Sequence, residues 1–74
     1  MKVEIYGTES CNFCKLAVDV AKKYGLDYEY FDASIDIAKF SNLFPGAASV
    51  PQVLVNNEWV GGYRDFLEVV EAMQ

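Results

Sequence analysis

The sequence contains no histidine and only two cysteines. Structural zinc sites usually need four nitrogen or sulfur ligands, so a single chain of this composition does not supply a closed zinc site by itself. Cationic residues are also scarce, because six Lys and Arg stand against eleven Asp and Glu, for a formal net charge of −5. Nucleic acids and anionic membranes attract cationic surfaces, so neither is expected as a partner.

Long apolar runs are absent as well. No stretch approaches the roughly 18 apolar residues that a membrane-spanning helix needs. The start, MKVEIYG, is interrupted by Glu4 and does not continue into the apolar core of a secretion signal. The sequence therefore predicts a cytoplasmic protein. Its 74 residues, 53% of them hydrophobic, suffice for one small core, and we expect a single domain over 1–74 that acts as a monomer.

The first part of the chain predicts a strand, a helix and a second strand. Val3 and Ile5 alternate with charged residues, which is typical of a strand. A helix is expected to begin at Cys11, with Ser10 as its N-cap, and to end before Gly25. Residues 26–32 alternate aromatic and acidic side chains and predict the second strand. The helix repeats its apolar residues with a period of 3.6, which predicts one inner face: Phe13, Leu16, Ala17, Val20, Ala21 and Tyr24.

The rest of the chain predicts a helix, a hairpin and a last helix. Ser34 is expected to cap a short helix that carries Ile37, Phe40, Leu43 and Phe44. Strands over 52–55 and 58–60 flank Asn56-Asn57, a pair that suits a tight turn because Asn tolerates positive φ. The order βαβαββα predicts an α/β fold with a four-stranded mixed sheet and three helices. The inner face of the last helix is expected to comprise Tyr63, Phe66, Leu67, Val70 and Met73.

Both cysteines lie in one short motif, Cys11-Asn12-Phe13-Cys14. A structural disulfide is disfavoured by the expected cytoplasmic setting, and such a small ring removes little entropy from the unfolded chain. Two inert buried cysteines or a redox pair remain. A C-x-x-C motif at the strand-to-helix junction of a βαβ unit is typical of a redox pair.

The end of the predicted helix gives this motif its chemistry. Cys11 is placed where backbone N–H groups lack intrahelical partners and the helix dipole is positive. Both features favour a thiolate, which is the nucleophile in disulfide exchange. Cys14 lies nearly one turn further along and is expected to be more buried. We therefore expect Cys11 to attack a disulfide and Cys14 to resolve the mixed disulfide that forms.

Three segments, VEIYGTESCNFC, SVPQVLV and VGGYRDF, together resemble a glutaredoxin, a branch of the thioredoxin fold. The resemblance spans nearly the whole chain. It implies a thiol–disulfide oxidoreductase that uses glutathione to reduce protein disulfides and glutathione mixed disulfides, with ribonucleotide reductase as a typical recipient of electrons. It implies glutathione as a reducing co-substrate and no tightly bound cofactor.

The resemblance also implies a glutathione site. Phe13 takes the aromatic position between the cysteines, and Val50-Pro51 matches a pair whose peptide bond is cis in this fold, with the Val50 backbone facing glutathione. Gly61-Gly62 implies close backbone approach. Asp65 matches the acid that meets the γ-glutamyl amino group, and Arg64 beside it is placed to contact the glutamyl carboxylate, although Asp65 is equally typical of an acid in the first turn of a helix.

Two positions depart from the family pattern. Asn12 replaces the usual Pro between the cysteines, and Thr8 replaces a Lys that meets the glycyl carboxylate of glutathione. Two alternatives therefore stay open. One is a thioredoxin-like electron donor that a flavoprotein reductase recycles. The other is a dimer that holds a [2Fe–2S] cluster through Cys11 and added glutathione, the only case in which a metal ligand is expected.

Overall fold

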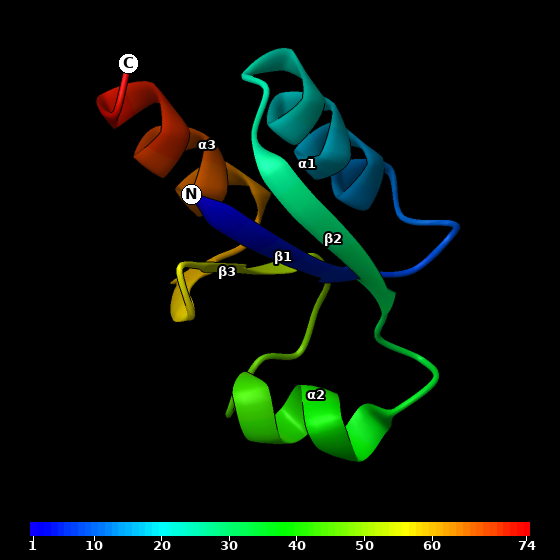
Figure 1. Cartoon of the computed structure of the whole chain (residues 1–74). Helices are drawn as coiled ribbons and strands as arrows, with labels where there is room; N and C mark the ends of the chain where they lie inside the picture. Colours follow the sequence, from blue (N-terminus) through cyan, green and yellow to red (C-terminus); the bar gives the residue numbers. More distant parts are fainter.

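A computed structural model describes all of residues 1–74. The chain forms seven elements in the predicted order (Figure 1): β1 Lys2–Gly7, α1 Asn12–Lys23, β2 Asp27–Asp32, α2 Ile37–Leu43, β3 Gln52–Val55, β4 Glu58–Gly61 and α3 Tyr63–Ala72. The strand order in the sheet is β2-β1-β3-β4. β1 pairs parallel with β2 and antiparallel with β3, and β4 pairs antiparallel with β3. The predicted four-stranded mixed sheet is confirmed.

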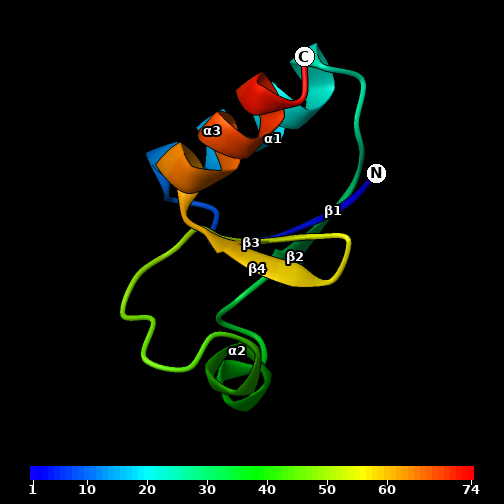
Figure 2. The ribbon, with the colours of Figure 1, turned by 90° about the vertical axis from the view of Figure 1, so that its left-hand side faces the viewer.

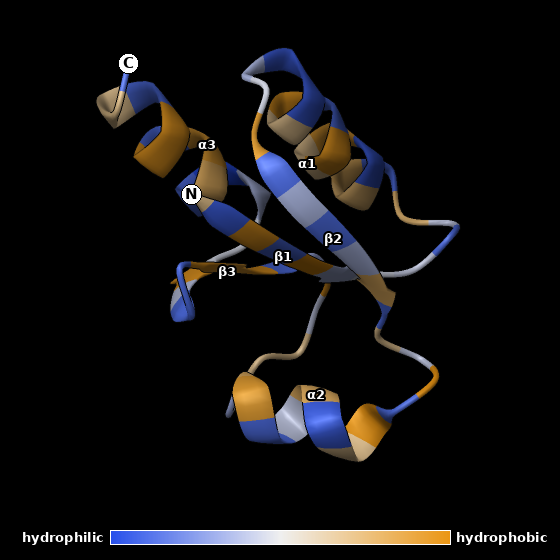
Figure 3. Cartoon of the chain, in the orientation of Figure 1, coloured by the Kyte–Doolittle hydropathy of each residue, from blue (hydrophilic) through white to orange (hydrophobic).

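The helices cover both faces of the sheet. α1 and α3 lie together on one face, and α2 lies on the other (Figure 2). Burial alternates along β1 as a result: Val3 and Ile5 are fully buried, while Glu4 between them is half-buried. The hydropathy of β1 alternates in the same way (Figure 3). β3 is buried at every position, because its neighbouring side chains enter the two opposite layers.

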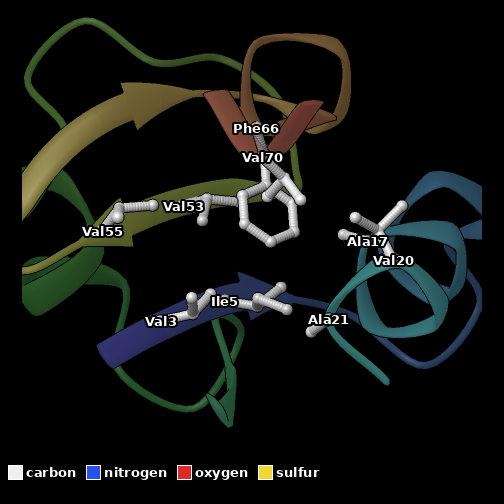
Figure 4. Packing of buried hydrophobic residues seen from close by; sticks show 9 residues of the cluster. All are labelled: Val3, Ile5, Ala17, Val20, Ala21, Val53, Val55, Phe66 and Val70. Atoms are coloured by element: carbon white, nitrogen blue, oxygen red, sulfur yellow. The ribbon is translucent and has the colours of Figure 1, made fainter. Parts of the chain in front are cut away.

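Two hydrophobic clusters result. The larger fills the space between the sheet and the pair of helices α1 and α3 (Figure 4): Val3, Ile5, Ala17, Val20, Ala21, Val53, Val55, Phe66 and Val70. The smaller lies on the α2 side of the sheet: Tyr6, Ala33, Phe44 and Leu54. The larger cluster fixes the position of the first turn of α1, where both cysteines lie.

The predicted inner faces are wrong at several positions. Phe13 and Leu16 are 53% and 40% exposed, because the buried stripe of α1 runs through Cys14, Ala17 and Ala21. Met73 is 56% exposed and follows the last residue of α3 as its C-cap. In α2 no residue is buried, and Ile37 is 69% exposed. The buried Phe44 instead lies just beyond the end of that helix.

Both predicted N-caps are also wrong. Cys11, not Ser10, caps α1, since its sulfur accepts a hydrogen bond from the Cys14 N–H. Asp36 caps α2 and accepts from the Lys39 N–H at 3.0 Å. Ser34 is held instead by Asp32, to which it donates from both its N–H and its hydroxyl. By contrast the predicted hairpin turn is confirmed, with positive φ at both Asn56 and Asn57.

Candidate active site

Cys11 follows β1 and stands at the N-terminus of α1. Its backbone is extended, with φ −90° and ψ 114°, and its side chain turns back over the first turn of the helix. The backbone N–H of Cys14 donates a hydrogen bond to the Cys11 sulfur at 3.2 Å. The sulfur therefore takes the position of a capping oxygen, facing N–H groups that have no intrahelical partner. A thiolate gains more from such donors than a thiol does.

A second segment reaches Cys11 from the loop before β3. The Cys11 thiol donates to the carbonyl oxygen of Val50 at 3.7 Å. The peptide bond between Val50 and Pro51 is cis, as predicted. The loop thus presents the Val50 backbone beside the sulfur of Cys11, although the two residues are far apart in sequence.

The two cysteines differ sharply in their surroundings. Both are free thiols, but Cys11 is partly exposed while Cys14 is fully buried. Burial, with added contributions from Cys11, raises the pKa of the Cys14 thiol to about 11, and the Thr8 backbone and the Tyr30 hydroxyl act in the opposite direction. The sulfur of Cys11 is therefore the more accessible of the two, as the predicted role of an attacking residue requires.

Beside this pair lies a hollow of about 270 Å³. It brings together six residues that the sequence assigned to glutathione binding: Phe13, Val50, Pro51, Gly62, Arg64 and Asp65. Ser49 and Tyr63 line it too and were missed, although each is adjacent in sequence to a predicted residue. Tyr63 packs against the exposed Phe13 with ring centroids 5.8 Å apart.

Thr8 does not join this hollow. It lines a larger one of about 550 Å³ between α1 and β2, together with Glu9, Lys15, Val18, Asp19, Lys22, Tyr28 and Tyr30. The predicted ligand residues therefore do not all converge, and Thr8 lies on the opposite side of the first turn of α1 from Arg64 and Asp65.

Asp65 has a structural role that does not depend on any ligand. Its carboxylate accepts a hydrogen bond from the backbone N–H of Gly62 at 3.2 Å, at the start of α3. Gly61 has φ 121°, and a Cβ there would collide with the Asp65 carboxylate. The predicted reading of Asp65 as an acid in the first helical turn is thus confirmed, and its exposed carboxylate also faces the hollow.

Other kinds of site find little support in the side chains. No group of three or more His, Cys, Asp and Glu residues is arranged to hold a metal ion. None of the helices has the length and apolar character needed to span a bilayer.

Comparison with known proteins identifies the family of this chain. A glutaredoxin family model matches residues 3–60. The chain belongs to the glutaredoxin family. Glutaredoxins are thiol–disulfide oxidoreductases, and this glutaredoxin is therefore an enzyme of that class. Cys11 is partly exposed, so the two cysteines are not both buried.

Three solved structures are similar to this glutaredoxin. Reduced Escherichia coli glutaredoxin is 30% identical with a TM-score of 0.83, over 97% of this chain and 95% of that one. A buckwheat glutaredoxin–glutathione complex is 17% identical with a TM-score of 0.81, over 96% and 69%. The glutaredoxin-like NrdH-redoxin of Escherichia coli is 19% identical with a TM-score of 0.80, over 100% and 96%. The predicted thioredoxin-like fold is confirmed.

Proposed function

We propose that this glutaredoxin takes its electrons from glutathione and passes them to disulfide-bearing or glutathionylated proteins. The observation that carries the proposal is the hollow beside Cys11, where residues from three separate sequence motifs meet. The buckwheat glutaredoxin, which has the same fold, forms a complex with glutathione. Enzymes such as ribonucleotide reductase are the class of protein substrate that the family resemblance suggests.

The charges around the hollow suit a small zwitterionic peptide. Arg64 offers a guanidinium to a carboxylate, and the exposed carboxylate of Asp65 suits an ammonium group. These two residues are neighbours at the start of α3, where the helix dipole further favours an anion. The glutamyl end of glutathione carries both a carboxylate and an ammonium group, so it matches this pair.

The thiol of glutathione is then directed toward Cys11. The Val50 backbone lies beside the Cys11 sulfur, and an extended peptide placed along it pairs through main-chain hydrogen bonds. On a glutathionylated protein, the Cys11 thiolate attacks the glutathione sulfur, a Cys11–glutathione disulfide forms, and the protein thiolate leaves and takes up a proton. A second glutathione thiolate then attacks that disulfide, which yields glutathione disulfide and free Cys11.

A protein disulfide needs both cysteines. Cys11 attacks one sulfur and releases the other as a thiol, which leaves the protein joined to Cys11. Cys14 then attacks Cys11, so the substrate departs fully reduced and a Cys11–Cys14 disulfide remains. Two glutathione molecules reduce that disulfide. The buried position of Cys14 next to Cys11 suits it to this internal step and not to attack on a bulky substrate.

The competing proposal concerns only the reductant. The NrdH-redoxin with the same fold has a thioredoxin-like activity profile, and the present chain lacks the Lys expected at Thr8. The test measures reduction of a small mixed disulfide with NADPH, glutathione and glutathione reductase, and in parallel with NADPH and thioredoxin reductase but no glutathione. Turnover in the first system supports glutathione as reductant. Turnover only in the second overturns the proposal in favour of a flavoprotein reductase.

A pair of variants ties the activity to the hollow. Arg64→Gln should raise the KM for glutathione by no more than about fivefold, because an exposed ion pair contributes only about 0–1 kcal/mol. Lys15→Gln is the matched control, since it removes an exposed cation from the larger hollow on the other side of α1. An equal rise in KM for both variants would mean that overall charge matters and not a contact at Arg64.

A further inference from the structure

A tyrosine hydroxyl lies next to the buried sulfur of Cys14. Tyr30 stands on β2, and its hydroxyl donates a hydrogen bond to the carbonyl oxygen of Thr8 at 3.1 Å. A Cβ built on Gly7 would lie 2.5 Å from both the Cys14 sulfur and the Tyr30 oxygen. The missing side chain at Gly7 therefore leaves a small space in which these two atoms face one another.

The electrostatics of the pair make Tyr30 a donor. Tyr30 as a whole is 39% exposed, but desolvation of its hydroxyl is the main cause that raises its pKa to about 12, and the nearby Cys14 sulfur adds to it. The pKa of Cys14 is raised to about 11, so Cys14 loses its proton before Tyr30 does. The hydroxyl thus still carries its proton when the Cys14 thiolate forms.

We propose that the Tyr30 hydroxyl turns from the Thr8 carbonyl to the Cys14 sulfur when Cys14 loses its proton, and thereby assists the resolving step. The hydroxyl hydrogen rotates about the C–O bond, so the change of acceptor requires no movement of the ring. The inference rests on the roles proposed above for Cys11 and Cys14. It concerns only reactions in which Cys14 attacks.

The step itself balances in sulfur, protons and electrons. Cys11 is joined by a disulfide to a substrate sulfur, and Cys14 begins as a thiol. The Cys14 thiolate attacks the Cys11 sulfur, the Cys11–Cys14 bond forms, and the bond to the substrate sulfur breaks. The substrate sulfur is reduced and takes up a proton from water, in place of the one that Cys14 released. Tyr30 keeps its own proton throughout and supplies a hydrogen bond to the negative charge.

Other charged groups near the pair do not serve this purpose. Asp32, on the same strand as Tyr30, raises the pKa of Tyr30 slightly, and Cys11 affects both Cys14 and Tyr30. Four charged side chains line the larger hollow with Tyr30: Glu9, Lys15, Asp19 and Lys22. None of these four makes a hydrogen bond to Cys14 or Tyr30. Tyr30 is the one side chain that lowers the pKa of the Cys14 thiol, whereas Cys11 raises it.

Tyr30→Phe is expected to change the rate of the resolving step in two opposing ways. Loss of a hydrogen bond to a charged acceptor should lower the fraction of Cys14 thiolate by roughly ten- to a hundredfold at neutral pH. The remaining thiolate is more basic and hence more nucleophilic, which restores about half of that loss on a logarithmic scale. Tyr30→Phe should therefore slow the resolving step by roughly three- to tenfold.

Ellman's reagent separates this step from the first. Cys11 attacks the reagent and releases one coloured thiolate, and Cys14 then resolves the mixed disulfide and releases a second. Stopped-flow absorbance follows both phases. Tyr30→Phe should slow only the second phase and move the pH midpoint of that phase upward. Tyr28→Phe is the matched control, because Tyr28 lines the same hollow on the same strand and is not among the groups that shift the pKa of Cys14.

Each outcome has a defined meaning. A second phase unchanged by Tyr30→Phe, in rate and in pH midpoint, overturns the inference. So does equal slowing of both phases, or an equal effect of Tyr28→Phe, since either would indicate a general effect on the fold. If the wild-type protein shows no second phase, or if Cys11→Ser still releases the first thiolate, the proposed roles of the two cysteines fail instead. Tyr30→Phe keeps the ring, and circular dichroism verifies that the variant is folded.

Discussion

The backbone N–H of Cys14 donates a hydrogen bond to the sulfur of Cys11 at 3.2 Å, so one atom both caps α1 and is placed to attack disulfides. The sulfur faces the unpaired N–H groups and the positive end of the helix dipole. The contact that defines the start of the helix therefore also orients the sulfur that is proposed to attack disulfides. If Ser10 had been the N-cap, as the sequence predicted, the Cys11 sulfur would not have accepted this capping hydrogen bond.

The two roles of Cys11 should separate on substitution. Cys11→Ser keeps a good capping atom, so the free energy of unfolding should change little, while turnover should be lost. Cys11→Ala removes the cap as well, at a cost of about 1 kcal/mol in stability. Urea unfolding and the glutathione-coupled assay measure the two properties independently. Equal stability of the wild-type protein and the Ala variant would show that the N–H···S contact contributes nothing to the fold.

Removal of the second thiol should affect the two reactions differently. Cys14→Ser should still reduce glutathionylated substrates, because only Cys11 is needed for that route. It should fail to release reduced product from a protein disulfide, since nothing resolves the mixed disulfide within the enzyme. Mass spectrometry of the reaction with insulin should then detect substrate joined to Cys11. Loss of both activities in Cys14→Ser would contradict the separate roles of the cysteines.

Stability should decline at alkaline pH in a defined range. The unfolded chain loses the Cys14 proton near 9.0, whereas burial raises the pKa of the folded protein's thiol to about 11. Between these values unfolding releases a proton, so the free energy of unfolding falls as pH rises, and the contribution is complete below pH 9. Urea unfolding at several pH values from 8 to about 11 measures the decline.

The matched control for that decline is Cys14→Ser, in which the slope over this range should be smaller. Tyr30 acts in the same direction at higher pH, because its pKa is raised from 10.0 to about 12. Tyr30→Phe should therefore flatten the upper part of the curve. A wild-type curve that is identical to both variants would contradict the assigned shifts.

Asp65 should prove to have two separable functions. Its carboxylate accepts the Gly62 N–H and also faces the hollow proposed for glutathione. Asp65→Asn retains an acceptor for Gly62, so it should preserve most of the stability while raising the KM for glutathione. Asp65→Ala should raise KM and also lose about 0.5–2 kcal/mol of stability with the cap. If Asn and Ala variants show the wild-type KM, the carboxylate is structural alone.

How much of the fold could be predicted depends on what each pattern measures. Alternation at Val3 and Ile5 and the turn at Asn56-Asn57 report local conformation, and both predictions are confirmed. The apolar period of 3.6 marks a helix but does not fix which part of the stripe meets the sheet. Phe13 fits the period and yet is exposed, because α1 buries Cys14 in its first turn. Competition between nearby caps, as at Ser34 and Asp36, likewise depends on where the preceding turn ends.

For the candidate site, too, the sequence predicted some residues and missed others. Residues carried by contiguous motifs, such as Val50-Pro51 and Arg64-Asp65, do converge on one hollow. Tyr30 could not be found, since Tyr28 and Tyr30 are equivalent in an alternating strand. What distinguishes them is the pairing of β2 with β1, in which Tyr30 lies opposite Ile5 and its hydroxyl reaches past the strand end to Thr8. Such a contact arises only when the sheet assembles.

Gly7 should be intolerant of even one added methyl group. A Cβ there would stand 2.5 Å from the Cys14 sulfur and from the Tyr30 oxygen, and 2.9 Å from the Cys14 Cβ. Gly7→Ala should therefore cost about 1–3 kcal/mol of stability through overpacking. It should also slow the resolving step, because the methyl group separates Tyr30 from the sulfur.

A double-mutant cycle tests whether the added methyl group clashes with the Cys14 sulfur. Combining Gly7→Ala with Cys14→Ala removes that sulfur, so the double variant should lose less stability than the sum of the two single variants. Strict additivity would mean that the methyl group is accommodated elsewhere and that Gly7, Cys14 and Tyr30 do not share one confined space.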